Sequence, residues 1–261
     1  TINKKTWLEC DKKYNFSWCG IHFHDVKSRI EIINSLKNNI FLIFLIKDLT
    51  NKYDIKKNHY LSEFTYIKKN EKQNILEKKI KNYSRERKII FMGGAIGKRK
   101  NLSNWSKIID QIDNDKYYFI QIGKVFFSDL DFEDKLAFKK ILKHHPKNIF
   151  IYNRFIKREK DFNSLINMSD AIYAVYKNFK SSSNMISKSL SFKIPILVSQ
   201  KGQMELDVKK YENGEIVAED DVTNSIRLLE KITNNKNKYK FDYQKINNMF
   251  ESRIKDIFSD Y

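Results

Sequence analysis

Cysteine, proline and glycine are scarce in this sequence. Its 261 residues include 2 Cys, 2 Pro and 7 Gly. Two cysteines cannot form a disulfide framework or a four-cysteine zinc site, which suits a reducing cytosol. The scarcity of proline and glycine also means that no flexible linker marks a domain boundary. A chain of this length can bury a hydrophobic core in one or two domains without cross-links.

Long hydrophobic runs are missing as well. The longest is IFLIFLI at residues 40–46, whereas a helix needs about 20 apolar residues to span a bilayer. The start of the chain shows no signal-peptide pattern. From these two absences we expect a cytoplasmic protein.

Lysine, in contrast, is abundant, and the formal net charge is +18. Such an excess is typical of proteins that bind nucleic acids or anionic membranes. Here the lysines are spread over every predicted helix, and no nucleic-acid-binding motif accompanies them. We therefore expect a solvated basic surface, no nucleic-acid partner, and a loose peripheral contact with an anionic membrane surface.

Short apolar runs alternate with amphipathic helix patterns from residue 88 onwards. This alternation predicts βαβ units and a parallel sheet. The predicted strands are residues 88–94, 117–123, 148–155, 171–176, 195–199 and 214–218. A closing helix is predicted over residues 221–233.

The first 80 residues are less regular. Aromatic and apolar residues suggest strand material at the start, followed by a helix at 29–36 and strands at 40–46 and 59–67. A lysine-rich helix is predicted at 71–83. The residues that suggest the first strand are Trp7, Phe16, Trp18, Ile21 and Phe23.

The change in pattern places a domain boundary near residue 84. We predict an N-terminal domain at 1–83, a Rossmann-like domain at 84–245 and a C-terminal helix at 246–261. Together they form an α/β fold.

Two loops follow predicted parallel strands and precede helices, the position where such sheets bind anions. Gly93 and Gly94 end one strand, and glycine lets the backbone approach a phosphate closely. Ser182, Ser183 and Asn184 precede another helix, which Asn184 can cap. Both loops are candidate phosphate sites.

Four segments then carry a resemblance: GGAIGKRKNL, LINMSDAIYAVY, SSSNMISKSLSFKIPILVS and MELDVKKYENGEIV. In order and spacing, residues 88–232 resemble the donor-binding domain of GT-B glycosyltransferases, and of glycosyltransferase family 4 in particular. The resemblance implies a GT-B-like fold with a short N-terminal α/β domain. It also implies transfer of a sugar from a nucleotide-sugar donor to a cell-surface glycan or lipid-linked acceptor. Retention of configuration and the absence of a metal cofactor are further implications.

The resemblance assigns roles to single residues. Lys100 matches the phosphate-binding lysine of the family, and Arg99 beside it adds a fork that can bind phosphate with two hydrogen bonds. Arg154 is expected beside the base, and Lys188 within reach of phosphate or sugar. His24 resembles the histidine that contacts donor sugar or acceptor at the mouth of the first domain.

The chain also departs from the family. Many members carry two glutamates eight positions apart where this chain has Lys180 and Lys188. The departure favours one alternative, a non-catalytic GT-B-like partner subunit. The net charge leaves a second alternative open, a basic nucleic-acid-binding protein. Asp129-Leu130-Asp131 matches the metal-binding DxD motif in form, but acidic residues are also expected at a helix start. We interpret it as a helix start and expect no metal.

Overall fold

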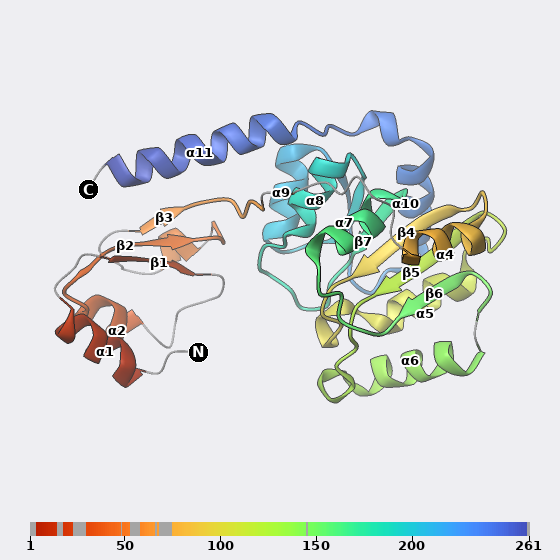
Figure 1. The fold of residues 1–261 in the computed structure, drawn as a ribbon, viewed down its shortest axis with the longest axis horizontal. Helices are drawn as coiled ribbons and strands as arrows, with labels where there is room; N and C mark the ends of the chain where they lie inside the picture. Colours follow the sequence, from red (N-terminus) through yellow and green to blue (C-terminus); the bar gives the residue numbers. More distant parts are fainter. Residues whose placement is uncertain are drawn as a thin grey trace. The chain divides into compact units, whose positions relative to one another are not determined.

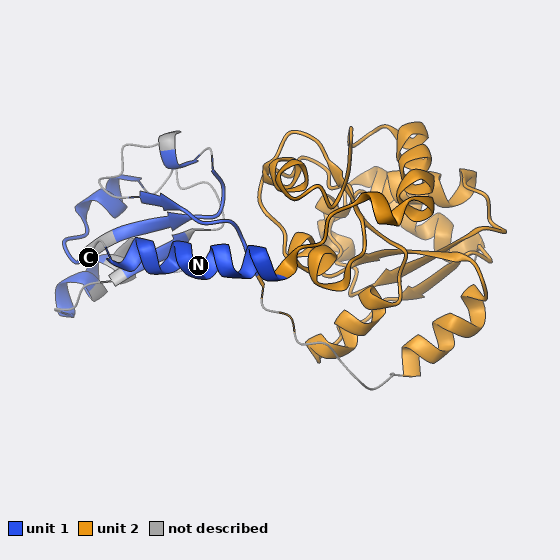
Figure 2. Cartoon of the chain, turned by 90° about the horizontal axis from the view of Figure 1, so that it is seen from above, with its two compact units in different colours: residues 1–64, 244–261 blue, residues 65–243 orange. Residues whose placement is uncertain are grey.

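The computed structural model describes residues 4–14, 18–22, 30–47, 49–52, 58–65, 67, 75–144 and 146–259. The chain divides into two compact units (Figure 2): unit 1 contains residues 1–64 and 244–261, and unit 2 contains residues 65–243. This division differs from the predicted domains at two places. Helix α4 (Ile75–Ser84) packs against α7 (Glu159–Asn167) and so belongs to unit 2. Helix α11 (Tyr243–Ser259) belongs almost entirely to unit 1.

Unit 2 is built on a six-stranded parallel sheet with the order β6-β5-β4-β7-β8-β9. The order reverses between β4 and β7, which in open α/β sheets is where ligands bind. All six predicted strands are present, and each is one to four residues shorter than predicted. Their bounds are β4 Lys88–Gly93, β5 Tyr117–Ile122, β6 Ile149–Tyr152, β7 Ala171–Ala174, β8 Ile196–Ser199 and β9 Gly214–Val217.

Helices cover both faces of this sheet (Figure 1). One face packs against α5 (Leu102–Gln111), α6 (Phe132–His144) and α10 (Val222–Asn234). The other lies under α4, α7, α8 (Met185–Phe192) and α9 (Gln203–Tyr211). Because both faces are buried, the strands are continuous apolar runs rather than alternating ones.

Unit 1 contains a three-stranded parallel sheet, β1 (Trp18–His22), β2 (Asn39–Phe44) and β3 (Asn58–Tyr60). Its short helices are α1 (Lys4–Lys13), α2 (Ile30–Ser35) and α3 (Leu49–Lys52). The strand predicted at the start of the chain is confirmed at Trp18 and Ile21, which lie in β1, and is wrong at Trp7, which lies in α1. Aromatic content favoured a strand, but the residues around Trp7 do not alternate between apolar and polar as a half-buried strand does. Phe16 and Phe23 lie outside the described residues.

The last helix completes the core of unit 1. Ile257 of α11 is fully buried against Phe41, Ile43, Leu45 and Leu61. The Phe258 ring lies 5.3 Å from that of Phe41. Residues from opposite ends of the chain therefore form one hydrophobic cluster.

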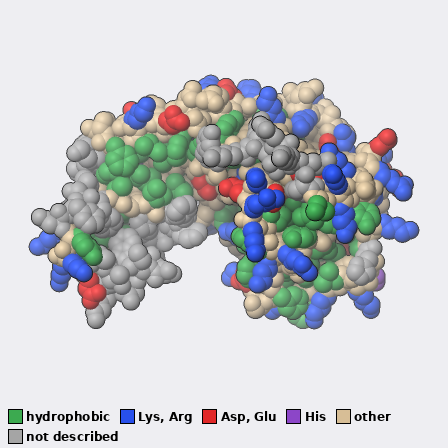
Figure 3. Space-filling view, in the orientation of Figure 1, with side chains coloured by type: hydrophobic (Ala, Val, Ile, Leu, Met, Phe, Trp, Pro, Cys, Tyr) green, Lys and Arg blue, Asp and Glu red, His purple; other side chains and the backbone are tan. Residues whose placement is uncertain are grey.

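None of the described helices is long and apolar enough to cross a membrane. Lysine and arginine side chains are distributed over the visible face of unit 2, with exposed hydrophobic side chains among them (Figure 3).

Candidate functional site

A cavity of about 460 Å³ opens at the carboxyl edge of the unit 2 sheet, at the reversal of strand order. This volume is within the range of about 300–1,000 Å³ that is usual for small-ligand sites. The cavity is lined by Gly93, Gly94, Ala95, Arg99, Lys100, Gly123, Lys124, Phe126, Phe155, Ile156, Lys157, Glu159, Phe162, Tyr176, Ser183, Asn184, Met185 and Lys188.

Two glycines form the floor of the cavity. Gly94 follows β4 with φ +97°, and Gly123 follows β5 with φ +134°. A Cβ atom on Gly123 would lie 1.9 Å from the carbonyl oxygen of Gly94, so the two backbones meet where no side chain fits. On the open side, a Cβ on Gly94 would meet only the Nζ of Lys100, at 3.9 Å. The turn therefore offers bare backbone to a ligand.

Lys100 is buried beside this turn, with 3% of its surface exposed. It ends the short helix η2 (Lys98–Lys100). Its Nζ donates to the Gly93 carbonyl oxygen at 2.8 Å and to the Tyr176 hydroxyl at 2.7 Å. Burial lowers the pKa of Lys100, and the neighbouring Tyr176 opposes that shift. The cation is thus held in place by protein groups.

Arg99 lies on the same wall. Its guanidinium carbon is 5.3 Å from the centre of the Phe179 ring, which in turn packs edge-on against Tyr176 at 5.2 Å. The carbonyl oxygen of Arg99 accepts a hydrogen bond from the Lys177 amide at 2.8 Å. Arg99 and Lys100 therefore both contact the segment that follows β7.

The start of α8 forms the opposite wall. Asn184 occupies the N-cap position, but its side chain makes no capping hydrogen bond. Ser183 Oγ instead accepts from the Met185 amide at 3.4 Å. The side-chain cap predicted for Asn184 is absent, because Asn184 has helical backbone angles (φ −60°, ψ −10°) rather than the extended angles of a capping residue. Ser183 and Asn184 line the cavity, whereas Ser182 is buried and does not.

Lys188 lies one turn further along α8. Its side chain is 3% exposed, and its Nζ donates to Asn163 Oδ1 at 2.7 Å and to Glu159 Oε1 at 3.1 Å. The ammonium also lies 4.9 Å from the centre of the Phe162 ring. Burial lowers the pKa of Lys188, and Glu159 opposes that shift.

Two other positions named from the sequence, Arg154 and Lys180, do not line the cavity. Arg154 is exposed just beyond β6 and does not line the cavity, since the turn there directs Phe155 and Ile156 to it. Lys180 is exposed, and its carbonyl oxygen accepts from the Gln203 amide. His24 lies outside the described residues.

Sequence reasoning missed Gly123, Tyr176 and Glu159. Gly123 had a usable signal, because it ends the predicted strand 117–123 as Gly93 and Gly94 end the predicted strand 88–94. Tyr176 is the last residue of an apolar run and looked like core. Glu159 stands in a charged stretch, KREKD, where nothing in the sequence separates it from its neighbours.

The Asp129–Asp131 segment is a helix start. Asp131 Oδ1 accepts from the Asp134 amide at 2.9 Å in the first turn of α6, and Oδ2 accepts from Lys177 Nζ at 2.6 Å. Asp129 Oδ2 accepts a long hydrogen bond of 3.4 Å from the Lys98 amide. Among the residues that the structure describes, no group of three or more His, Cys, Asp or Glu side chains is arranged to hold a metal ion.

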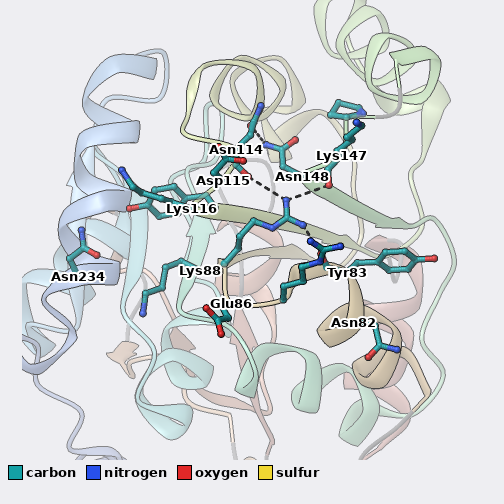
Figure 4. Close-up of a pocket in the computed structure, with 14 residues that line it drawn as sticks. Asn82, Tyr83, Glu86, Lys88, Asn114, Asp115, Lys116, Lys147, Asn148 and Asn234 are labelled. Carbon is teal, nitrogen blue, oxygen red and sulfur yellow. Dashed lines mark hydrogen bonds between the residues drawn. The ribbon is translucent and has the colours of Figure 1, made fainter.

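A second, wider hollow of about 1,270 Å³ lies at the amino edge of the same sheet (Figure 4). Arg87 lines this hollow and donates to the carbonyl oxygens of Ser84 at 3.1 Å, Tyr83 at 2.5 Å, Asn114 at 3.3 Å and Lys147 at 3.5 Å. The hydrogen bonds dashed in Figure 4 include those to the residues labelled Asn114 and Lys147, which precede β5 and β6. Arg87 thus ties together the segments before three strands, a structural role.

We expect Arg87→Lys to lower the free energy of unfolding by about 1–3 kcal/mol, because one ammonium cannot satisfy four carbonyl groups spaced for a guanidinium. Urea denaturation measures this. Arg85→Lys is the matched control: Arg85 lines the same hollow, is exposed, and should change stability by about 0.5 kcal/mol or less. Equal effects of the two substitutions would contradict the role of Arg87.

No protein-family profile matches the sequence, and no curated protein matches it. The order of the parallel strands, which reverses between β4 and β7, and the helices on both faces define a Rossmann-like unit. Comparison with solved structures narrows this to the fold of GT-B glycosyltransferases, as the sequence resemblance implied.

Three of these structures illustrate the similarity. Sucrose-phosphate synthase from Thermosynechococcus elongatus has a TM-score of 0.70 at 9% identity, covering 99% of this chain and 72% of that one. Anabaena HepE in complex with UDP and glucose has a TM-score of 0.73 at 11% identity, and the match covers 97% of this chain and 76% of that one. The UDP-forming α,α-trehalose-phosphate synthase from Burkholderia vietnamiensis has a TM-score of 0.72 at 10% identity, and the match covers 95% of this chain and 70% of that one. At these identities the likeness establishes the fold.

Proposed function

We propose that the protein is a glycosyltransferase that binds a nucleotide-sugar donor, in the first place a UDP-sugar, in the unit 2 cavity. The observation that carries this proposal is the buried Lys100 ammonium beside the Gly93-Gly94 turn, at the reversal of strand order. HepE, one of the structures with this fold, was solved with UDP and glucose. The acceptor that we propose is a cell-surface glycan or a lipid-linked sugar, and the proposed location is the cytoplasm with peripheral contact to an anionic membrane.

In this proposal the donor pyrophosphate lies over Gly94, between Lys100 and the start of α8. The bond between the sugar C1 and the phosphate oxygen breaks, and the acceptor hydroxyl oxygen bonds to C1. Negative charge grows on the leaving phosphate, and fixed cations and N–H groups at that place lower the barrier by several kcal/mol. The leaving phosphate takes the proton of the acceptor hydroxyl, which therefore approaches C1 from the same face that the phosphate leaves. Configuration is then retained without a protein nucleophile.

Neither binding nor transfer needs a metal ion in this proposal, because Lys100 and Arg99 supply the positive charge. We expect UDP to bind equally well in EDTA and in Mg²⁺, and Asp129→Asn to bind UDP like the wild-type protein. Isothermal titration measures both. Binding that requires Mg²⁺ would contradict the metal-independent site, and absence of UDP binding in either buffer would contradict the donor itself.

One observation favours a second candidate, a non-catalytic GT-B-like partner subunit. Lys188 stands where many members of family 4 have a glutamate, and its ammonium contacts protein groups. A transfer assay separates the two functions, because a partner subunit would bind UDP-sugar without releasing UDP in the presence of acceptors.

A further inference from the structure

The cavity holds one carboxylate among several cations. Of the described residues that line it, five are basic and Glu159 alone is acidic. The basic residues are Arg99, Lys100, Lys124, Lys157 and Lys188. A pyrophosphate suits the cations but is repelled by a carboxylate. Glu159 therefore fits a different part of a ligand, one that donates hydrogen bonds.

The Glu159 carboxylate is held at one end and open at the other. Its Oε1 accepts from Lys188 Nζ at 3.1 Å. No described residue donates a hydrogen bond to its Oε2, and 60% of the side chain is exposed. Glu159 is also the first residue of α7, where the helix dipole stabilises a negative charge. The carboxylate thus has one oxygen bonded to Lys188 and one oxygen open to a ligand.

Lys188 acts on Glu159 rather than on a ligand. Its buried ammonium contacts three residues of α7: Asn163 Oδ1 at 2.7 Å, Glu159 Oε1 at 3.1 Å and the Phe162 ring at 4.9 Å. These contacts leave it little freedom to reach a phosphate. Lys188 is thus a positioning residue for the carboxylate.

We infer that Glu159, oriented by Lys188, binds vicinal hydroxyl groups of the nucleotide-sugar donor. This inference rests on the proposed function. A carboxylate only accepts hydrogen bonds, and the neighbouring hydroxyls of the ribose and of the transferred sugar are paired donors that suit it. Lys188 lies one helical turn, about 5.4 Å, from the start of α8 where the phosphate is proposed. The ribose adjoins the phosphate in a nucleotide and is therefore the first source of these hydroxyls; the transferred sugar is the second.

The test compares ligands as well as variants. Isothermal titration of wild type and Glu159→Gln uses inorganic pyrophosphate, UDP, 2′-deoxy-UDP and UDP-glucose. We expect Glu159→Gln to weaken UDP about 10-fold, to remove most of the preference for UDP over 2′-deoxy-UDP, and to leave pyrophosphate unchanged or slightly tighter. If Glu159→Gln weakens the binding of UDP-glucose but not that of UDP, the carboxylate still binds vicinal hydroxyls, and these hydroxyls belong to the transferred sugar.

Lys188→Met gives a second readout, because it keeps the side-chain length and removes the cation. We expect the preference for UDP over 2′-deoxy-UDP to fall as in Glu159→Gln, and the double variant to be no worse than either single one. Lys157→Met is the matched control. It removes a cation from the same cavity and should weaken pyrophosphate and UDP alike, without changing the preference.

Two outcomes would overturn the inference: unchanged UDP and UDP-glucose affinities in Glu159→Gln, or an equal loss of pyrophosphate and UDP in it. Failure of the proposed function is recognised separately, since wild-type protein would then bind pyrophosphate but not UDP.

Discussion

Replacing Lys100 should lower kcat by about 100-fold or more, the usual effect of removing one preorganised stabilising group. Its ammonium is fixed between the Gly93 carbonyl oxygen and the Tyr176 hydroxyl, so no reorganisation is needed as charge grows on the leaving phosphate. Because the interaction strengthens toward the transition state, kcat should fall more than donor affinity. The kcat of Arg99→Lys should lie between those of Lys100→Ala and wild type, since lysine keeps the charge but lacks the two-pronged guanidinium.

The burial of Lys100 changes the choice of variant. A loop lysine is expected to contribute little to stability, but Lys100→Ala leaves two buried polar partners unpaired and should cost about 1–3 kcal/mol. Lys100→Met fills the same space and is the better variant for the rate. Lys98→Met is the matched control in the same short helix, because Lys98 is exposed and does not line the cavity. Transfer at the wild-type rate by Lys100→Met would show that the pyrophosphate binds elsewhere.

Gly123→Ala should destabilise unit 2 by about 2–5 kcal/mol, which combines backbone strain with overpacking. Its φ of +134° disfavours any side chain, and its Cβ would lie 1.9 Å from the carbonyl oxygen of Gly94. Either the β5 end or the glycine turn has to move, and the cavity floor moves with it. We therefore expect loss of UDP binding even under conditions in which the variant stays folded.

Urea denaturation and UDP titration together check this prediction. Gly94→Ala provides the comparison, because Gly94 has a positive φ but open space where a Cβ would lie. This variant should be destabilised only by backbone strain, by roughly 1–2 kcal/mol. Ala95→Ser, in the same loop and exposed, should remain within about 0.5 kcal/mol of wild type. A Gly123→Ala protein as stable as wild type would mean that the two backbones do not meet as described.

The sheet of unit 2 could be predicted because its strands are buried on both faces and read as unbroken apolar runs. The start of unit 1 could not, because Trp7 favours a strand by composition while its neighbours favour a helix. In the site, the glycine turn and the nearby Lys100 follow from local sequence. The burial of Lys100 depends on Tyr176, which is 76 residues away, and the setting of Lys188 depends on Glu159, which is 29 residues away. Such pairings depend on how α7, α8 and the loops pack together, and a local sequence pattern carries no information about that packing.

The contribution of α11 to the core of unit 1 bears on the order of events during protein synthesis. The β1–β3 sheet leaves the ribosome first, but Ile257 and Phe258, which cover it, leave after the whole of unit 2. Unit 2 has all its own residues available earlier and is free to fold while unit 1 is still uncovered. Until translation reaches α11, Phe41 and Ile43 remain an apolar surface on the nascent chain, of the kind that chaperones bind.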